Sequence, residues 1–205
     1  MKYSLFIFSI FYCNLVFSNT RHIIYDSLNY PLQYCDHYVL TSVNNYHEGV
    51  TTGYIIPQLE FLGTNHYLRK TTYSSMYQAG VFEIVSTEND KCKKNIYSNE
   101  TFYLIFKNSP ILKSQYLAIS EQNFYYLSES RKNKFSFYAP NPSLLNRVFL
   151  NYQDNLKNNN FIDCYGEYWC KTSAYVTGSI SVRLTPVSLT QYGKARQPVY
   201  TIITP

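Results

Sequence analysis

Short apolar runs recur along this chain in an ordered set of four, and the set occurs three times. The runs are rich in β-branched and aromatic residues and are bounded by Asn, Ser, Gly and Pro, which is typical of strands separated by turns. Their starting residues are Tyr38, Tyr54, His66 and Val81 in the first set, Phe102, Tyr116, Tyr125 and Phe135 in the second, and Val148, Phe161, Tyr168 and Ile180 in the third. The chain therefore repeats one four-strand unit three times.

A single unit of this kind cannot bury its own apolar face, so three units must meet around a common axis. We therefore predict an all-β fold, the β-trefoil, in which six strands close a short barrel and three hairpins cap one end. Closure also removes exposed strand edges. The alternative is a β-sandwich. The predicted core consists of Leu40, Ile55, Phe82, Leu104, Leu117, Phe135, Phe149, Phe161 and Val182.

The two ends of the chain lie outside the repeat. Residues 1–18 have a positive start at Lys2, an apolar run too short to span a bilayer, and small residues before Asn19, which is typical of a signal peptide. We expect an extension over 19–33, the β-trefoil domain over 34–187, and a second extension over 188–205. Extra strands are expected over 22–25 and 199–203, paired with each other. The mature protein is expected to be secreted and extracellular, without membrane insertion.

The four cysteines of the mature chain allow three disulfide pairings, and an even number in an exported protein favours disulfides over a metal site. The short separation of Cys164 and Cys170 suits a bridge across a tight hairpin, which leaves Cys35 with Cys92. The first unit is longer than the others because of a polar stretch near 90–99, for which we expect a surface loop.

The formal net charge of +5 is spread along the chain, so we expect no nucleic-acid partner. The sequence has no nucleophile elbow, no zinc-protease helix motif and no phosphate-binding glycine loop. We therefore expect no enzymatic activity, no cofactor and no metal. Asn99 begins an Asn-Glu-Thr acceptor sequence for N-glycosylation.

The segment 160–164, Asn-Phe-Ile-Asp-Cys, followed by Tyr168-Trp169-Cys170, resembles a repeat of the ricin-B-type lectins. The second unit is similar to the strand rhythm of β-trefoil proteins more widely. The resemblance implies a lectin-like protein that binds a glycan, with an aromatic ring against the sugar and a carboxylate or amide on its hydroxyls. Only the third unit offers such an Asp, so one site is expected, formed by Asp163, Trp169, Asn160, Tyr165 and Tyr168.

Two other functions remain open. The layout of length, export and two disulfides also resembles the soybean-type β-trefoil protease inhibitors, whose reactive loop follows the fourth strand of the first unit. The corresponding stretch, 86–99, carries Lys91, Lys93 and Lys94, which suit a trypsin-like pocket. The tyrosine content also fits a structural or interaction protein of a parasite or viral coat, with a surface or coat protein as its partner.

Overall fold

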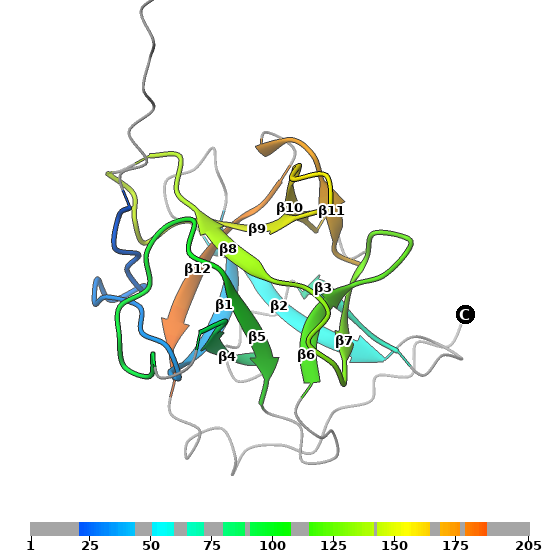
Figure 1. Ribbon diagram of the computed structural model, residues 1–205, viewed down its shortest axis with the longest axis horizontal. Helices are drawn as coiled ribbons and strands as arrows, with labels where there is room; N and C mark the ends of the chain where they lie inside the picture. The colour runs from blue at the N-terminus through cyan, green and yellow to red at the C-terminus, as the bar shows by residue number, and fades with distance from the viewer. Residues whose placement is uncertain are drawn as a thin grey trace, which may run out of the picture.

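The computed structural model describes residues 21–43, 51–59, 65–71, 80–88, 91–107, 115–141, 143–164, 169–176 and 179–187. These residues contain twelve strands (Figure 1). The strands of the first unit are β1 (His37–Val43), β2 (Thr51–Leu59), β3 (His66–Thr71) and β4 (Val81–Ser86). The second unit has β5 (Phe102–Phe106), β6 (Gln115–Ile119), β7 (Tyr125–Ser128) and β8 (Phe135–Tyr138). The third has β9 (Phe149–Gln153), β10 (Asn159–Asp163), β11 (Lys171–Ser173) and β12 (Ser181–Pro186).

Six of these strands form a closed ring. Antiparallel pairing joins β1 to β4, β4 to β5, β5 to β8 and β8 to β9. A bridge between Val148 and Val182 links the start of β9 to β12, and β12 pairs with β1 to complete the barrel. The other six strands form the hairpins β2–β3, β6–β7 and β10–β11, which gather on one side of the barrel in Figure 1.

The strand register repeats three times. Within each unit, the first and fourth strands pair through equivalent residues, which are Tyr38 with Phe82, Phe102 with Phe135, and Val148 with Val182. Between units, the equivalent pairs are Leu40 with Leu184, Leu104 with Ile84, and Leu150 with Phe137. Two independent sets of pairs thus obey the same threefold rule. The fold is a β-trefoil, as predicted, and not a β-sandwich.

The core follows from alternation along these strands, because successive side chains of a strand point to opposite faces of the sheet. All nine residues predicted for the core are buried. Seven of them belong to the central cluster, whereas Phe149 and Phe161 make an edge-to-face contact with their ring centroids 6.1 Å apart. Burial of each large aliphatic or aromatic side chain contributes about 2 kcal/mol to folding.

The segment before the first unit pairs with the insertion of that unit. Ile23 bridges to Tyr97, and Gln33 bridges to Asn95. Between them, the fully buried Ile96 accepts a backbone hydrogen bond from Ile24 and donates one to Leu32. The prediction of a surface loop near 90–99 is therefore wrong for 95–98, where two residues bridge to the preceding segment and Ile96 and Ser98 are buried, whereas Asn99 is exposed. The expected strand over 22–25 has 95–97 as its neighbour and makes isolated bridges.

The predicted signal peptide and the C-terminal segment 188–205, which includes the expected strand over 199–203, lie outside the described residues. Among the residues that are described, no helix has the length and apolar character needed to cross a membrane.

Candidate functional site

The three hairpins meet through three backbone bridges, one between each pair of units. Tyr67 of β3 pairs with Tyr126 of β7. Phe124 pairs with Lys171, and Trp169 pairs with Arg69. The return strand of each hairpin contributes two residues to these bridges, which we call its first and second positions. Each bridge joins the first position of one hairpin to the second position of the next hairpin. The first positions are Tyr67, Phe124 and Trp169, and the second positions are Arg69, Tyr126 and Lys171.

Between these positions lies one inward-facing residue from each unit. Leu68, Tyr125 and Cys170 are fully buried, and they connect through backbone hydrogen bonds from Tyr125 to Cys170 (2.9 Å) and from Cys170 to Leu68 (2.7 Å). Because neighbours along a strand face opposite sides, the three aromatic first positions face outward. Each unit thus places one buried and one half-buried residue where the hairpins converge.

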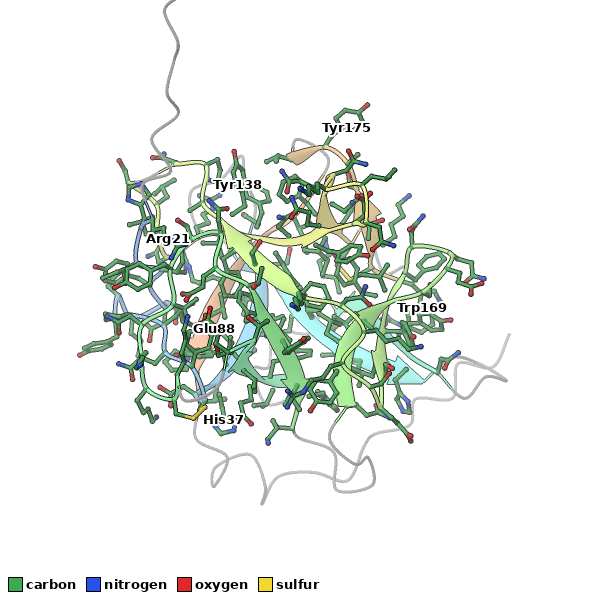
Figure 2. All side chains as sticks on the ribbon, viewed as in Figure 1. Arg21, His37, Glu88, Tyr138, Trp169 and Tyr175 are labelled. Atoms are coloured by element: carbon green, nitrogen blue, oxygen red, sulfur yellow. A yellow bond between two sulfur atoms is a disulfide. The ribbon has the colours of Figure 1, made fainter. Side chains whose placement is uncertain are left out.

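The outward aromatic rings contact one another around Tyr67. The Tyr67 ring centroid lies 5.7 Å from that of Trp169 and 6.1 Å from those of Phe124 and Tyr126. We call these four half-buried side chains the cap cluster. Figure 2 shows Trp169 at the side of the molecule formed by β3 and β7. Partly exposed aromatic clusters are typical of interaction surfaces, because their apolar area remains available to a partner.

The disulfide of the third hairpin positions Trp169. Cys164 at the end of β10 bonds to Cys170, which follows Trp169 directly and is fully buried. The six-residue separation matches the predicted pairing. With its neighbour fixed in the core, Trp169 stays on the outer face beside Arg69.

The aromatic surface continues from the cap cluster across β6 to the barrel strand β5. Ala118 pairs with Tyr126, and Tyr116 lies two residues earlier on the same face of β6. Tyr116 pairs with Ile105, two residues from Tyr103 on β5, and the rings of Tyr103 and Tyr116 make an edge contact at 6.3 Å. Tyr103 and Tyr116, both half-buried, are named the wall pair.

A cationic loop between β7 and β8 lies on this surface. The Arg131 guanidinium is 5.4 Å and 5.2 Å from the ring centroids of Tyr103 and Tyr116, and its Nε donates to the Tyr116 hydroxyl at 3.0 Å. Lys132 Nζ lies 5.7 Å from the Tyr126 ring centroid and donates to its hydroxyl at 3.0 Å. These hydrogen bonds raise the pKa of both side chains.

Asp163 lies at the end of β10, where it pairs with Lys171 across the hairpin. Burial raises the pKa of its carboxyl, and the positive charges of Lys171 and Lys70 oppose that rise. Lys171 is one of the second positions around the cap cluster, so Asp163 is at the rim of the surface that carries Trp169.

Asn160 has a different environment. Its side-chain amide donates to Asn158 O at 3.1 Å and to Asp154 Oδ2 at 3.5 Å. These residues line a shallow depression of about 520 Å³ with Tyr138 and Phe161. The Asp154 carboxylate already organises the turn, because it accepts the backbone amides of Leu156 and Asn158. Tyr165 and Tyr168, the remaining predicted site residues, lie outside the described residues.

Sequence reasoning missed Tyr67, Phe124 and Tyr126. Two of them belong to the predicted runs that begin at His66 and Tyr125, and alignment of those starts makes Tyr126 the equivalent of Tyr67. The bridges make Phe124, and not Tyr126, the equivalent of Tyr67, which is a register difference of two residues. Composition alone cannot resolve that difference in a run of consecutive aromatic residues.

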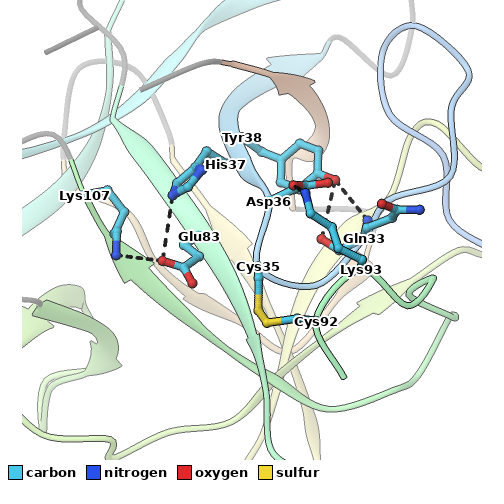
Figure 3. Close-up of a disulfide and its surroundings, with 9 residues drawn as sticks. All are labelled: Gln33, Cys35, Asp36, His37, Tyr38, Glu83, Cys92, Lys93 and Lys107. Atoms are coloured by element: carbon cyan, nitrogen blue, oxygen red, sulfur yellow. Dashed lines mark hydrogen bonds and ion pairs between the residues drawn. A yellow bond between two sulfur atoms is a disulfide. The ribbon is translucent and has the colours of Figure 1, made fainter. Parts of the chain in front are cut away.

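The described part of the lysine-rich stretch 86–99, which is 86–88 and 91–99, is held by contacts at several points. Lys91 Nζ donates to Glu100 at 2.6 Å, pairs with Glu88 at 3.0 Å, and lies 5.9 Å from the Tyr34 ring centroid. Cys92 forms the predicted disulfide with Cys35. Figure 3 shows that disulfide and the neighbouring ion pair between Lys93 and Asp36. The Lys94 side chain is exposed.

Asn99 lies in the turn that leads into β5. Its φ of 62° is left-handed, its backbone amide donates to Phe137 O at 2.9 Å, and its side chain is exposed. Thr101, the third residue of the acceptor sequence, is also exposed. Both residues are therefore on the surface of the molecule.

No protein-family model and no curated protein sequence matches the chain. Solved structures do. A water-soluble chlorophyll protein from Brassica oleracea var. botrytis, with chlorophyll b, has a TM-score of 0.60 and 13% identity, covering 82% of this chain and 100% of its own. Alocasin, a protease inhibitor from giant taro (Arum macrorrhizon), has a TM-score of 0.62 and 12% identity, covering 81% and 99%.

The trypsin inhibitor from soybean has a TM-score of 0.57 and 10% identity, covering 81% of this chain and 99% of its own. These proteins share the β-trefoil fold with this chain, and their names are those of inhibitors and binding proteins. At identities this low, the likeness establishes the shared fold alone.

Proposed function

We propose that this chain is an exported, non-catalytic protein that binds carbohydrate on the cap cluster. The observation that carries the proposal is the convergence of Tyr67, Phe124 and Trp169, one from each unit, into half-buried rings with centroids 5.7 Å and 6.1 Å apart. These three side chains lie outside the buried layer of Leu68, Tyr125 and Cys170, so part of their apolar area stays at the surface, where a ligand can contact it.

The chemistry of sugars matches this surface. A pyranose ring presents a face of C–H groups that stacks on an aromatic ring, while its hydroxyls need hydrogen-bonding groups at the edge. Tyr67 and Tyr126 supply phenolic hydroxyls beside the rings, and Asp163 supplies a carboxylate at the rim. Export is supported by the apolar segment in 1–18 and by the two disulfides, which persist in oxidising compartments.

The test is an array of neutral and acidic glycans probed with the protein produced in a secretory host. We expect binding that is lost in Trp169→Ala and in Tyr67→Ala. The matched control is Tyr175→Ala, because Tyr175 is 75% exposed and lies away from Trp169 in Figure 2. The proposal would be contradicted if Trp169→Ala and Tyr67→Ala bound glycans as well as the wild type and the Tyr175→Ala control, with circular dichroism like that of the wild type.

A second candidate is inhibition of a trypsin-like protease by the stretch 86–99, which the fold shared with soybean trypsin inhibitor supports. An inhibitor must extend a lysine into the protease pocket. Lys91 would first have to leave Glu88 and Glu100, whereas Lys94 is exposed. Trypsin inhibition that is lost in Lys94→Ala but kept in Trp169→Ala would favour this candidate over carbohydrate binding.

A further inference from the structure

Positive side chains surround the aromatic surface. Lys171 and Arg69 occupy two of the three second positions around the cap cluster. Lys132 lies on Tyr126, and Arg131 lies on the wall pair. Lys70 is close enough to Asp163 to affect its pKa. Asp163 offsets part of this charge at Lys171, and Glu121 offsets part of it at Lys132.

Arg131 retains capacity for a ligand. Its Nε is used by the Tyr116 hydroxyl, but a guanidinium carries five N–H donors in a planar fork that suits carboxylate and sulfate oxygens. The side chain is exposed, and two aromatic rings hold it in one orientation. A donor that is already oriented loses less conformational entropy when it binds an anion.

The loop that carries these cations is anchored. Asn133 Oδ1 accepts the backbone amide of Ile119 on β6 at 2.9 Å, and the Ser128 hydroxyl accepts the amide of Ser130 at 3.3 Å. Arg131 and Lys132 lie between these two anchors. Their position over the rings is therefore a property of the folded backbone and not of two flexible side chains alone.

The aromatic surface is elongated. It crosses four neighbouring strands in the order β3, β7, β6 and β5, from Tyr67 through Tyr126 and Tyr116 to Tyr103. At the usual spacing of paired strands this corresponds to about 14 Å. An extended ligand such as an oligosaccharide would therefore reach from the rings of Tyr67, Phe124 and Trp169 to Arg131 over the wall pair.

We infer that the ligand is an acidic polysaccharide, whose sugar rings stack on the cap cluster while its carboxylate or sulfate groups bind Lys132 and Arg131, the cation that lies over the wall pair. This inference rests on the proposed carbohydrate-binding function and specifies its ligand class. A neutral chain would gain the stacking contacts alone. An acidic chain gains both the stacking and the charged contacts, and its affinity falls as salt rises.

The experiment measures binding of three immobilised probes to the full chain: heparin for sulfate groups, polygalacturonate for carboxylate groups and laminarin as a neutral glucan. The variant is the double substitution Arg131→Gln/Lys132→Gln. We expect about a tenfold loss of affinity for an anionic probe at low salt, since two exposed charge contacts are removed, with laminarin binding unchanged. The relative loss on heparin and on polygalacturonate identifies the anionic group.

The matched control is Arg21→Gln/Lys94→Gln, which removes the same two charges from exposed side chains elsewhere. Figure 2 shows Arg21 on the side of the molecule opposite Trp169. We expect this control to bind like the wild type, and Arg131→Lys/Lys132→Arg, which keeps both charges, to retain most of the affinity. Circular dichroism reports whether each variant is folded.

An equal loss in both glutamine variants, or wild-type binding of both anionic probes by Arg131→Gln/Lys132→Gln, would overturn the inference. Binding of laminarin alone, lost in Trp169→Ala, would also overturn it while the proposed function stands. If no saccharide binds through Trp169, the proposed function itself fails.

Discussion

Among the residues that the structure describes, six other than glycine have left-handed backbone conformations, with φ between 62° and 66°. They are Asn29, Cys35, Lys93, Asn99, Asn123 and Lys157. The whole chain has only seven glycines, so its turns rely on other residues. Asn tolerates this conformation because its short side chain bonds locally, whereas Lys gains no such compensation. The turns at 26–30 and 154–158 are alike, each with an Asp carboxylate that accepts two backbone amides.

Lys157 therefore stores strain that Asn would relieve. We expect Lys157→Asn to raise the free energy of unfolding by about 0.5 kcal/mol. Urea denaturation followed by tyrosine fluorescence measures the change. Lys94→Asn is the control, because Lys94 is exposed and is not one of the left-handed residues. A gain of the same size in the control would mean that loss of positive charge, and not relief of strain, is responsible.

Glu100 makes stability depend on pH. Burial would raise the pKa of its carboxyl, but hydrogen bonds from Lys91 Nζ and the Tyr97 amide, with the Lys91 charge, bring it below the ordinary value of 4.5. A lowered carboxyl pKa contributes stability that is present above about pH 4.5 and is lost as the pH falls through the folded-state value.

We expect Glu100→Gln to lower the free energy of unfolding at pH 7 by about 1–2 kcal/mol, because Lys91 then loses its closest carboxylate. The difference from the wild type should shrink as the pH falls below 4. Thermal unfolding from pH 3 to pH 7 measures it. A difference that stays constant with pH would show that packing, and not ionisation, causes the loss.

At the scale of strands and turns, each disulfide closes a loop of very different length. Cys35–Cys92 spans 57 residues and Cys164–Cys170 spans 6. By loop-closure entropy alone, the first contributes about 4 kcal/mol and the second about 2 kcal/mol. We expect Cys35→Ala/Cys92→Ala to lose more stability in urea than Cys164→Ala/Cys170→Ala. Equal losses of stability would indicate that the cavity left by the fully buried Cys170 offsets the difference in loop-closure entropy.

The first hairpin depends on a glycine. Gly53 has a φ of 154°, and a Cβ there would come within 2.1 Å of the backbone oxygen of Thr71 on the partner strand. The register between β1 and β2 also shifts beside it, after Ser42. We expect Gly53→Ala to cost at least about 2 kcal/mol of stability and to weaken ligand binding, because it moves the strand that carries Tyr67.

Gly80→Ala provides the comparison for this variant. Its Cβ would approach Pro57 Cδ at 2.8 Å, a less severe overlap than the 2.1 Å at Gly53, and Gly80 does not have a positive φ. A smaller loss is therefore expected there in the same urea titration. If Gly80→Ala is the more damaging of the two, backbone conflict at Thr71 is not what makes Gly53 necessary.

The predictable elements were those with local signals. Alternating apolar residues located the barrel strands, and the short spacing of Cys164 and Cys170 gave the disulfide pairing. The convergence of Tyr67, Phe124 and Trp169 was not predictable, because it depends on the register with which three hairpins meet. The bridge between Ile23 and Tyr97 was not predictable for the same reason. The apolar signal beside it in 91–99 is the buried Ile96, which stands between polar neighbours in the sequence.

At the scale of the whole molecule, threefold equivalence predicts how the core responds to substitution. Leu40, Leu104 and Leu150 occupy one equivalent position in the three units and are fully buried. We expect Leu→Ala at each to cost about 3 kcal/mol, within the usual range for buried leucines. Leu156→Ala, at an 81% exposed leucine, should change stability by less than about 0.5 kcal/mol. A marked difference among the three core variants would show that the units share topology but not packing.

The exposed acceptor sequence gives a second prediction for the intact protein. Produced in a glycosylating secretory host, it should carry a glycan at Asn99 that an N-glycosidase removes, with a corresponding loss of mass. Asn99→Gln should abolish that change in mass. An unmodified wild-type mass from the same host would contradict the assignment.

The pairing of β1 with β12 has a consequence for how the molecule forms. Thr41 hydrogen bonds to Arg183, 142 residues later, so the ring remains open until nearly the whole described chain is present. Proteins dominated by such distant pairings fold slowly, because the entropy of joining remote segments is lost before the contacts that compensate for it form. If the chain is exported, as we propose, it completes its barrel only after β12 has left the translocation channel.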